Sequence, residues 1–519
     1  MARCFLGLDS STQGLTAVLI DLDSRRVVGE AALSFDAALP AYGTRNGVLR
    51  SDDPRVVHAP PLMWAEALDL VFASLARQAA PLGELLAISG SGQQHGSVYL
   101  NAGAERVIEA LDPSRPLAAQ LAGVFARSTA PTWMDSSTSE ECREIEAALG
   151  GPRATAEATG SAAFERFTGP QIRRFFKTSP EDYARTVRIS LVSSFLASLV
   201  AGRLAPIDHG DGAGMNLMDI RRRCWHPQAL AATAPDLERR LLPPVPPWQV
   251  VSPVARYWAE RHAVNPAALA CVWSGDNPCS VVGTGLVRPG QVAISLGTSD
   301  TYFGTMAECR IDPAGEGHAF AAPTGAYMSL ICFKNGSLAR ERVRDLYGLD
   351  WGGFSRAIAS TPPGNHGKLM LPYFEPEIVP RVPAPGVRRF DLREDDVAGN
   401  CRAVVEAQML SMRRHSAWMG VRPERIYATG GASRNPEILQ VMADVHECPV
   451  SRFEVTNSAA LGAALRAAHA WHARGERPLA WPDVVEGFCD PVPGSEIRPR
   501  PEAAAAYRPL LARLAELSA

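Results

Sequence analysis

The feature that most constrains the fold is a pattern that occurs twice along the chain. An apolar strand leads into a short turn of small hydroxyl residues, and a second strand follows at once. The first copy is GLDSSTQGLTAVLID (residues 7–21), and the second is VAISLGTSDTYFG (residues 292–304). Two such hairpins, one in each half of the chain, predict two related α/β domains that each offer a turn to a shared cleft.

The length and the order of predicted elements agree with this reading. A chain of 519 residues exceeds what one hydrophobic core usually supports. Strand-like and helical patterns alternate along it, which indicates an α/β architecture. The proline-rich run LPPVPP (residues 242–247) can continue neither a helix nor a central strand. We therefore predict domains over residues 1–250 and 251–519, with a surface tail from about residue 475.

Composition excludes several classes of partner. The net charge of −3 gives no reason to expect nucleic acid or an anionic membrane. The apolar stretch Ile189 to Ala201 is too short to span a bilayer and predicts a buried helix. The ten cysteines show no metal-site spacing, which favours buried, reduced thiols. With no apolar signal region before Asp9, we expect a cytoplasmic protein, either a monomer or a homodimer.

The two turns carry the chemistry of phosphate binding. Turns of Gly, Ser and Thr expose the N–H and O–H donors that surround a phosphate. A carboxylate such as Asp9 suits that place if a Mg²⁺ ion lies between it and the phosphate. The alternative is a turn in which Asp9 only caps its own backbone. A P-loop is excluded, because none of the lysines (Lys177, Lys334 and Lys368) lies in its motif.

A third nucleotide-binding candidate is GGASRN, residues 430–435, which follows a predicted strand. Glycines at the end of a strand let a ligand approach the backbone, here an adenine or a ribose. Asn435 and Pro436 are suited to the cap and the first position of a helix. The alternative interpretation is a tight connection from strand to helix without a ligand.

Polar residues on other glycine-rich loops indicate an acceptor with several hydroxyl groups. Gln94 and His95 follow a predicted strand, as do Asp276 and Asn277. Asp211 lies between small residues in GDGAG, where nothing shields its carboxylate from a substrate. Phosphate-binding turns, one exposed carboxylate and hydroxyl-binding groups together suggest phosphoryl transfer to a polyol or sugar.

These segments together resemble the FGGY carbohydrate kinases, within the superfamily of actin, heat-shock chaperones and sugar kinases. The resemblance rests on GLDSSTQGLTAVLID, ISGSGQQHGSVYL, FERFTGPQIRRF, DHGDGAGMNLMDI, WSGDNPCSVVG, ISLGTSDTYFG, CFKNGSLARERVRD and GGASRNPEILQVMADVHECPV. It implies two ribonuclease-H-like domains around a central cleft, with ATP and Mg²⁺ bound there. The animal-type members that phosphorylate D-xylulose are the most similar, which implies a pentulose as acceptor.

The resemblance also implies a role for each candidate residue. Asp211 matches the general base that accepts the hydroxyl proton, and Asp9 matches the acid linked to the metal. The other matches are Thr12, Gln13, Thr298 and Ser299 at the phosphates; Gly430, Gly431, Ser433 and Asn435 at the adenosine; and Gln94, His95, Arg166, Asp276 and Asn277 at the sugar.

Three alternatives stay open. The segment FERFTGPQIRRF departs from many family members at Pro170 and at Arg173 and Arg174, so Arg166 could instead form an ion pair at the surface or between domains. The acceptor could be ribulose, fuculose, glycerol or erythritol. A nucleotide switch similar to actin is the alternative from another class, although it would need neither Asp211 nor an acceptor site.

Overall fold

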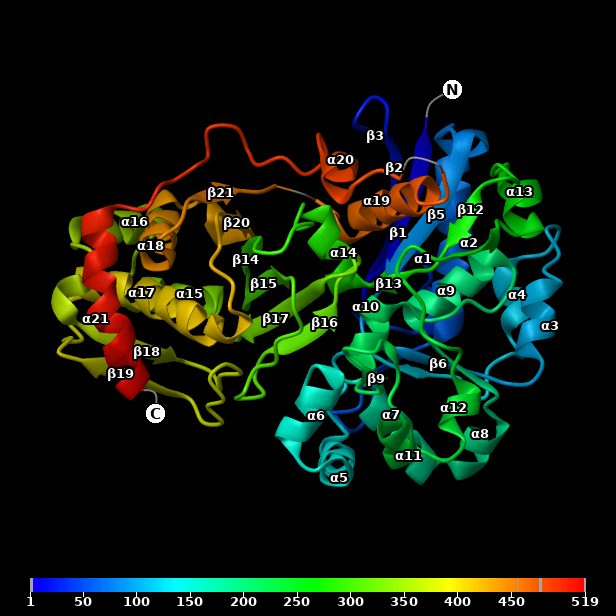
Figure 1. Cartoon of the computed structure of the whole chain (residues 1–519), viewed down its shortest axis with the longest axis horizontal. Helices are drawn as coiled ribbons and strands as arrows, with labels where there is room; N and C mark the ends of the chain where they lie inside the picture. Colours follow the sequence, from blue (N-terminus) through cyan, green and yellow to red (C-terminus); the bar gives the residue numbers. More distant parts are fainter. Residues whose placement is uncertain (1–2, 455, 476–477, 518–519) are drawn as a thin grey trace. The chain divides into compact units, whose positions relative to one another are not determined.

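The computed structural model describes residues 3–454, 456–475 and 478–517. Its helices and strands alternate along the chain, as Figure 1 shows, which confirms the predicted α/β class. The chain divides into two compact units. The first comprises residues 1–287, 320–327 and 455–489, and the second comprises residues 288–319, 328–454 and 490–519.

The first unit is built on a mixed sheet with strand order β11-β12-β5-β1-β2-β3, and β13 also pairs with β5. The first predicted hairpin lies in this sheet, since β1 pairs antiparallel with β2 and parallel with β5. Its strands are β1 (Cys4–Ser10), β2 (Gly14–Asp21), β3 (Arg26–Ser34), β5 (Leu85–Gly92), β11 (Val250–Pro253), β12 (Leu269–Cys271) and β13 (Ser274–Gly275).

Helices α2 (Pro61–Arg77) and α9 (Val192–Ala201) bury apolar side chains in one core with β1, β2 and β5. The other strands of the first unit are β4 (His58–Ala59), β6 (Ser97–Leu100), β7 (Ala130–Pro131), β8 (Arg188–Leu191), β9 (Met218–Asp219) and β10 (Cys224–Trp225). Its other helices are α1 (Phe35–Ala38), α3 (Ala104–Glu109), α4 (Leu117–Leu121), α5 (Ser139–Leu149), α6 (Pro152–Thr159), α7 (Thr168–Thr178), α8 (Pro180–Arg185), α10 (His209–Gly212), α11 (Pro227–Thr233), α12 (Leu237–Arg240), α13 (Arg256–His262), α14 (Asp276–Gly283), α19 (Ser458–His472) and α20 (Trp481–Val485).

The second sheet has the order β16-β17-β15-β14-β20-β21. Its centre repeats the first unit, because β14 pairs antiparallel with β15 and parallel with β20. The strands are β14 (Val292–Leu296), β15 (Asp300–Met306), β16 (His318–Ala321), β17 (Tyr327–Phe333), β20 (Ile426–Thr429) and β21 (Val450–Arg452), with β18 (Leu369–Tyr373) and β19 (Gly386–Phe390) in a separate pair. The helices of the second unit are α15 (Ser337–Leu346), α16 (Trp351–Ser360), α17 (Val397–His415), α18 (Pro436–His446) and α21 (Pro501–Leu517).

Helix α19 belongs to the first unit although it lies late in the sequence, because glycines let its backbone approach other backbones closely. A Cβ atom on Gly7 of β1 would lie 2.0 Å from the carbonyl oxygen of Ala460. A Cβ on Gly462 of α19 would likewise lie 1.9 Å from the carbonyl oxygen of Cys279 in α14. Backbone atoms cannot yield as a flexible side chain can, so the first glycine of GLDSSTQG is required by packing against α19.

We expect Gly7→Ala to lower the free energy of unfolding by about 1–3 kcal/mol, the usual cost of an extra methyl group in a close-packed contact. Thermal unfolding followed by circular dichroism measures this loss. Gly123→Ala is the matched control, since a Cβ there would meet no atom within 4 Å. Equal melting temperatures for both variants would contradict the packing role of Gly7.

The first unit continues beyond the domain boundary predicted near residue 250. Strands β11 and β12 extend its sheet, so the two units part between residues 287 and 288. The proline-rich run is not a linker, because it lies against the segment that precedes α10. The Val245 N–H donates to the carbonyl of Ile207 (3.0 Å), and the Val245 carbonyl accepts from the His209 N–H (2.9 Å).

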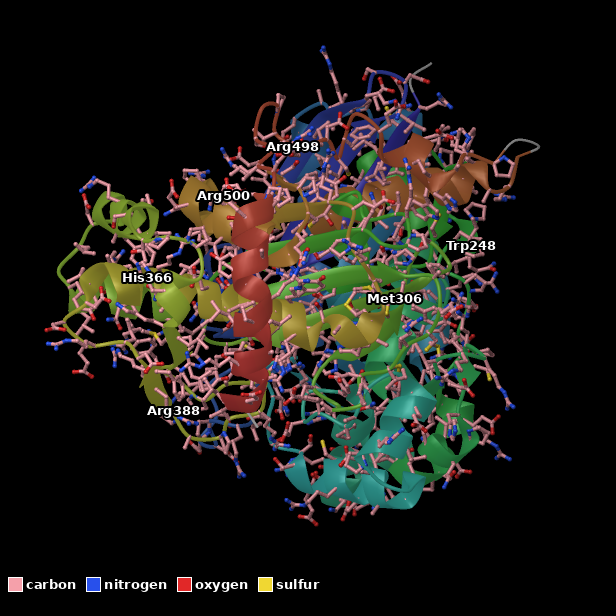
Figure 2. All side chains as sticks on the ribbon, turned by 60° about the vertical axis from the view of Figure 1, so that its left-hand side comes forward. Trp248, Met306, His366, Arg388, Arg498 and Arg500 are labelled. Carbon is pink, nitrogen blue, oxygen red and sulfur yellow. The ribbon has the colours of Figure 1, made fainter. Side chains whose placement is uncertain are left out.

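Two further expectations differ from the structure. The apolar stretch expected as one helix is divided, because its first residues form the end of β8 and only α9 is helical. The expected surface tail is wrong for α21, whose residue Tyr507 is buried and donates to Glu406 (2.7 Å). Figure 2 shows Arg500 beside the start of this helix, where it pairs with Asp444 (2.6 Å). Residues 476–477 lie outside the described residues.

All ten cysteines are free thiols, as expected, although Cys224 is exposed rather than buried. Within the described residues, every helix is too short or too polar to cross a bilayer.

Candidate active site

Asp211 lies in the short helix α10 and is buried, with 1% of its surface exposed. The expectation of an exposed carboxylate is wrong, because every residue of α10 is buried. The hydroxyl of Ser193, in the first turn of α9, donates to its Oδ2 at 2.5 Å. Its other oxygen, Oδ1, is buried and has no hydrogen-bond partner among the described residues. An unpartnered buried carboxylate oxygen is costly, and it marks a place where a ligand hydroxyl would fit.

Burial raises the pKa of Asp211 well above its ordinary value, and the nearby carboxylates of Asp208 and Asp276 raise it further. The Ser193 hydrogen bond and the charge of Arg466 act in the opposite direction. A carboxyl group with a raised pKa binds a proton more strongly, so Asp211 has the chemistry of a general base.

A buried amide group that is only partly hydrogen-bonded lies near this oxygen. A Cβ on Gly275 would lie 2.9 Å from Asp211 Oδ1 and 3.0 Å from Cγ of Gln94. Both side chains therefore lie beside Gly275 of β13. Gln94 accepts from Asn277 Nδ2 (2.9 Å), but its own Nε2 has no partner among the described residues. Neither polar side-chain atom of Gln93 has one there either. Such a group of free donors and acceptors suits a ligand with several hydroxyls.

His95 offers a neutral imidazole to the same region. Burial lowers its pKa to about 3, and the charge of Arg166 lowers it as well. Its Nδ1 lies 2.8 Å from the carbonyl oxygen of Gly214, which can only accept a hydrogen bond. Nδ1 is therefore protonated, and Nε2 remains an acceptor for a hydroxyl group. Arg166 packs over the rings of Phe164 and Phe167.

The first hairpin turn places Asp9 at the end of β1, where the Ser91 hydroxyl donates to its Oδ1 at 2.6 Å. Burial raises the pKa of Asp9 to about 6. Burial, with a contribution from the Asp9 charge, raises the pKa of Asp276 to about 7. Two buried carboxylates, one of which raises the pKa of the other in this way, would favour a bound cation.

The rest of this turn is held by its surroundings. The indole N–H of Trp133 donates to the Thr12 hydroxyl at 2.8 Å. Gln13 is exposed, and its carbonyl accepts from the Phe35 N–H (2.9 Å). Thr12 and Gln13 thus lie in the turn itself, beside Asp9, as predicted.

The second hairpin turn exposes Thr298 and Ser299 between β14 and β15. Asp300 follows them and is fully buried in a bidentate ion pair with Arg340. Nη1 and Nη2 of Arg340 donate to Oδ2 (2.7 Å) and Oδ1 (2.8 Å) of Asp300. The Ser337 N–H donates to the carbonyl of Gly297 (2.9 Å), which fixes the start of the turn. The two hydroxyl residues are therefore presented on a rigid base.

A pocket of about 550 Å³ lies in the second unit beside the GGASRN segment. Its lining includes Gly431, Asn435, Trp351, Ser337 and Glu341. The side-chain oxygen of Asn435 caps α18 by accepting from the N–H groups of Glu437 and Ile438, as predicted for this residue. The exposed indole of Trp351 offers a flat apolar face suited to a planar ring.

Gly430 and Ser433 support this pocket and are not part of its lining. Gly430 has a φ of +83°, and a Cβ there would lie 2.5 Å from the Leu296 carbonyl oxygen, so only glycine fits at this crossing. The Ser433 hydroxyl donates back to the Gly430 carbonyl (2.7 Å) and closes the turn.

The structure therefore gathers the predicted residues in two groups. The residues in the first unit are Asp9, Thr12, Gln13, Gln94, His95, Arg166, Asp211, Asp276 and Asn277, and those in the second are Thr298, Ser299, Gly430, Gly431, Ser433 and Asn435. The sequence interpretation missed Ser193 and Trp351. Neither carries a clear local signal, because Ser193 lies in an apolar run and Trp351 is the first residue of helix α16.

Comparisons with known proteins agree with this arrangement. The N-terminal domain of the FGGY family of carbohydrate kinases matches residues 128–283, and its C-terminal domain matches residues 292–471. The chain is 43% identical to a xylulose kinase of Rattus norvegicus, over 99% of this chain and 96% of that protein. It is 43% identical to xylulose kinase 2 of Arabidopsis thaliana, over 90% of this chain and 87% of that one.

Among solved structures, a xylulose kinase from Rhodospirillum rubrum superposes with a TM-score of 0.82. The alignment covers 99% of this chain and 98% of that one at 22% sequence identity. At this identity the likeness concerns the fold, and it extends over both units.

Proposed function

Because the chain belongs to the FGGY family of carbohydrate kinases, we propose that it transfers the γ-phosphoryl group of ATP to D-xylulose. The product would be D-xylulose 5-phosphate. The observation that carries this proposal is the buried Oδ1 of Asp211, which has no hydrogen-bond partner among the described residues and lies beside Gly275 together with Gln94, whose Nε2 has none either. That set of groups suits a hydroxylated acceptor, and a nucleotide switch has no need of it.

In the proposed reaction, Asp211 Oδ1 accepts the proton of the sugar's terminal hydroxyl group. The hydroxyl oxygen forms a bond to the γ-phosphorus, and the bond between that phosphorus and the β,γ-bridging oxygen breaks in line, so ADP leaves. A positioned general base typically contributes on the order of 10²- to 10⁴-fold in rate. Ser193 keeps the carboxylate oriented by holding Oδ2.

Sugar recognition falls to the groups around Asp211. His95 Nε2 accepts from one hydroxyl, while Gln94 Nε2 donates to another. Asp276 and Asn277, at the start of α14, and Arg166 complete the set of donors and acceptors. Unpaired buried polar groups reject a ligand that lacks the matching hydroxyl, which favours a pentulose over a shorter polyol.

The residues also fit a Mg²⁺ ion. Kinases hold this ion by one or two carboxylates together with phosphate oxygens and water, and Asp9 offers such a carboxylate, with the negative charge of Asp276 nearby. When bound, the ion would neutralise phosphate charge and fix the orientation of the phosphates. Thr12 and Gln13 in the first unit would donate to phosphate oxygens, as would Thr298 and Ser299 in the second.

The adenosine would occupy the pocket beside Gly431 and Asn435, against the face of Trp351. We expect Trp351→Ala to raise the KM for ATP roughly tenfold, because an aromatic contact contributes about 1 kcal/mol beyond the apolar surface that it buries. The kcat should change little, since the chemistry takes place at the phosphate. Steady-state rates at saturating sugar measure both constants.

Trp248→Ala is the matched control, because this indole is exposed to a similar extent (38% against 41%) in the first unit (Figure 2). An unchanged KM for ATP in Trp351→Ala, or an equal rise in the control, would remove the indole from the nucleotide site.

The experiment that tests the proposed function is identification of the product. Purified protein with ATP, Mg²⁺ and D-xylulose should give equal amounts of ADP and a phosphomonoester, and ³¹P–¹H NMR should place the phosphate on C5. Parallel reactions with ribulose, fuculose, glycerol and erythritol test the rival acceptors. Faster phosphorylation of one of these would replace D-xylulose as the substrate.

We infer a cytoplasmic location from the cysteines, which are all free in a fold that brings several into the core. We also expect the enzyme to act as a monomer or a homodimer, and sedimentation measures this directly.

A further inference from the structure

A buried arginine close to Asp211 has no part in the mechanism so far. Arg466 lies on α19 and is 2% exposed. Its Nη2 donates to Asp208 Oδ2 (3.1 Å) and to the Pro247 carbonyl (3.0 Å), and its Nη1 donates to the Gly90 carbonyl (3.3 Å). Burying a guanidinium costs free energy unless it is paired and hydrogen-bonded. The buried position of Arg466 is therefore stabilised by these partners.

Its partner Asp208 is the N-cap of α10, the helix that carries Asp211. Asp208 Oδ1 accepts from the Asp211 N–H (2.9 Å) and from the Ser274 hydroxyl (2.9 Å), while Oδ2 is held by Arg466. Both oxygens of Asp208 thus accept hydrogen bonds, whereas one oxygen of Asp211 has no partner in the part of the chain that the structure describes. The cap fixes the backbone of Asp211 at one point, and Ser193 fixes its side chain at another.

We propose that Arg466 and Asp208 are positioning residues for Asp211, holding α10 so that Oδ1 stays free and balancing the charge around it. The proposal rests on the proposed function, in which Asp211 is the base. It assigns a task to α19, a helix that lies between two segments of the second unit in the sequence yet packs within the first unit.

The charged groups around Asp211 predict in which direction each variant shifts the pKa of Asp211. Asp208 on α10 and Asp276 on α14 raise the pKa of Asp211, while Arg466 on α19 lowers it. Without Arg466, the charge of Asp208 would act on Asp211 uncompensated. Without the charge of Asp208, Arg466 would favour the ionised form of Asp211 more strongly. The two changes therefore shift the ionisation of the base in opposite directions.

The test is the pH dependence of kcat/KM for the sugar, because its acidic limb reports the base of the free enzyme. Arg466→Met should move this limb to higher pH by about one unit. At a fixed pH on the acidic limb, activity should fall by up to tenfold and recover as the pH rises, and the KM for ATP should stay constant. Asp208→Asn keeps an oxygen for the cap but removes the charge, so its limb should move to lower pH.

Arg402→Met is the matched control for loss of a buried ion pair. Arg402 donates to Glu406 Oε1 at 2.6 Å in α17 of the second unit, and both side chains are buried. This variant should lose thermal stability as Arg466→Met does, yet keep the limb of the wild-type enzyme. If Arg466→Met does not fold, the shift of the acidic limb in Asp208→Asn tests the positioning role by itself.

The positioning role would be overturned if the acidic limb stayed at the wild-type pH in both variants, or if it moved in the same direction in both. Such a result with a wild-type enzyme that phosphorylates D-xylulose would leave the proposed function standing. A wild-type protein that phosphorylates no sugar would instead remove both proposals.

Discussion

Asp211→Asn should reduce kcat by about 10²- to 10⁴-fold while leaving sugar affinity within a few-fold of wild type. An amide has nearly the shape of the carboxylate but cannot accept the hydroxyl proton, so the loss equals the usual contribution of a general base. The Ser193 hydroxyl can still donate to the amide oxygen. Single-turnover rates and isothermal titration with sugar separate the loss of chemistry from any loss of binding.

The same variant should be at least as stable as the wild-type enzyme at pH 8. Burial raises the pKa of Asp211 in the folded state, so its ionisation costs stability as the pH rises from the unfolded value through the folded one. An amide escapes this cost, and its advantage should shrink toward pH 4. A variant that keeps more than about a tenth of wild-type turnover, or that simply unfolds at pH 8, would contradict the assignment.

Asp9→Asn should lower kcat by roughly 10²-fold and raise the Mg²⁺ concentration needed for half-maximal rate. The variant keeps the hydrogen bond from Ser91 but loses the charge that holds the metal, and bound metal ions contribute several kcal/mol to such reactions. In the wild-type enzyme the Mg²⁺ requirement should rise below about pH 6, because protonation then removes the same charge. Mg²⁺ titrations of the rate at several pH values measure both effects.

Asp53→Asn is the control for Asp9→Asn, since Asp53 lies on the surface of the same unit and forms an ion pair with Arg55. The control should keep the wild-type response to Mg²⁺. An equal response in Asp9→Asn would place the metal elsewhere.

The features that could be predicted from the sequence are those written into short local patterns. Both hairpins follow from alternating apolar runs around small-residue turns, and their pairing with a parallel neighbour repeats in the two sheets. The cap formed by Asn435 follows from the preference of that position. Asp211 stood out because two glycines flank it, and the structure leaves one of its oxygens unpartnered among the described residues.

The remaining features depend on contacts between distant parts of the chain. Arg466 meets Asp208 across 258 positions, and no periodicity within α19 signals a guanidinium in its buried face. Ser193 looked like part of an apolar helix, although its hydroxyl serves the buried carboxylate. The proline-rich run resembled a linker, since its pairing with the segment before α10 comes from tertiary structure alone.

Release of ADP with and without sugar tests most directly whether the protein transfers a phosphoryl group to D-xylulose with Asp211 as the base. With saturating ATP and Mg²⁺, the account predicts ADP formation that depends on D-xylulose, is slow in its absence, and nearly disappears in Asp211→Asn. Equal ADP formation with and without the sugar, or full activity of that variant, would contradict it.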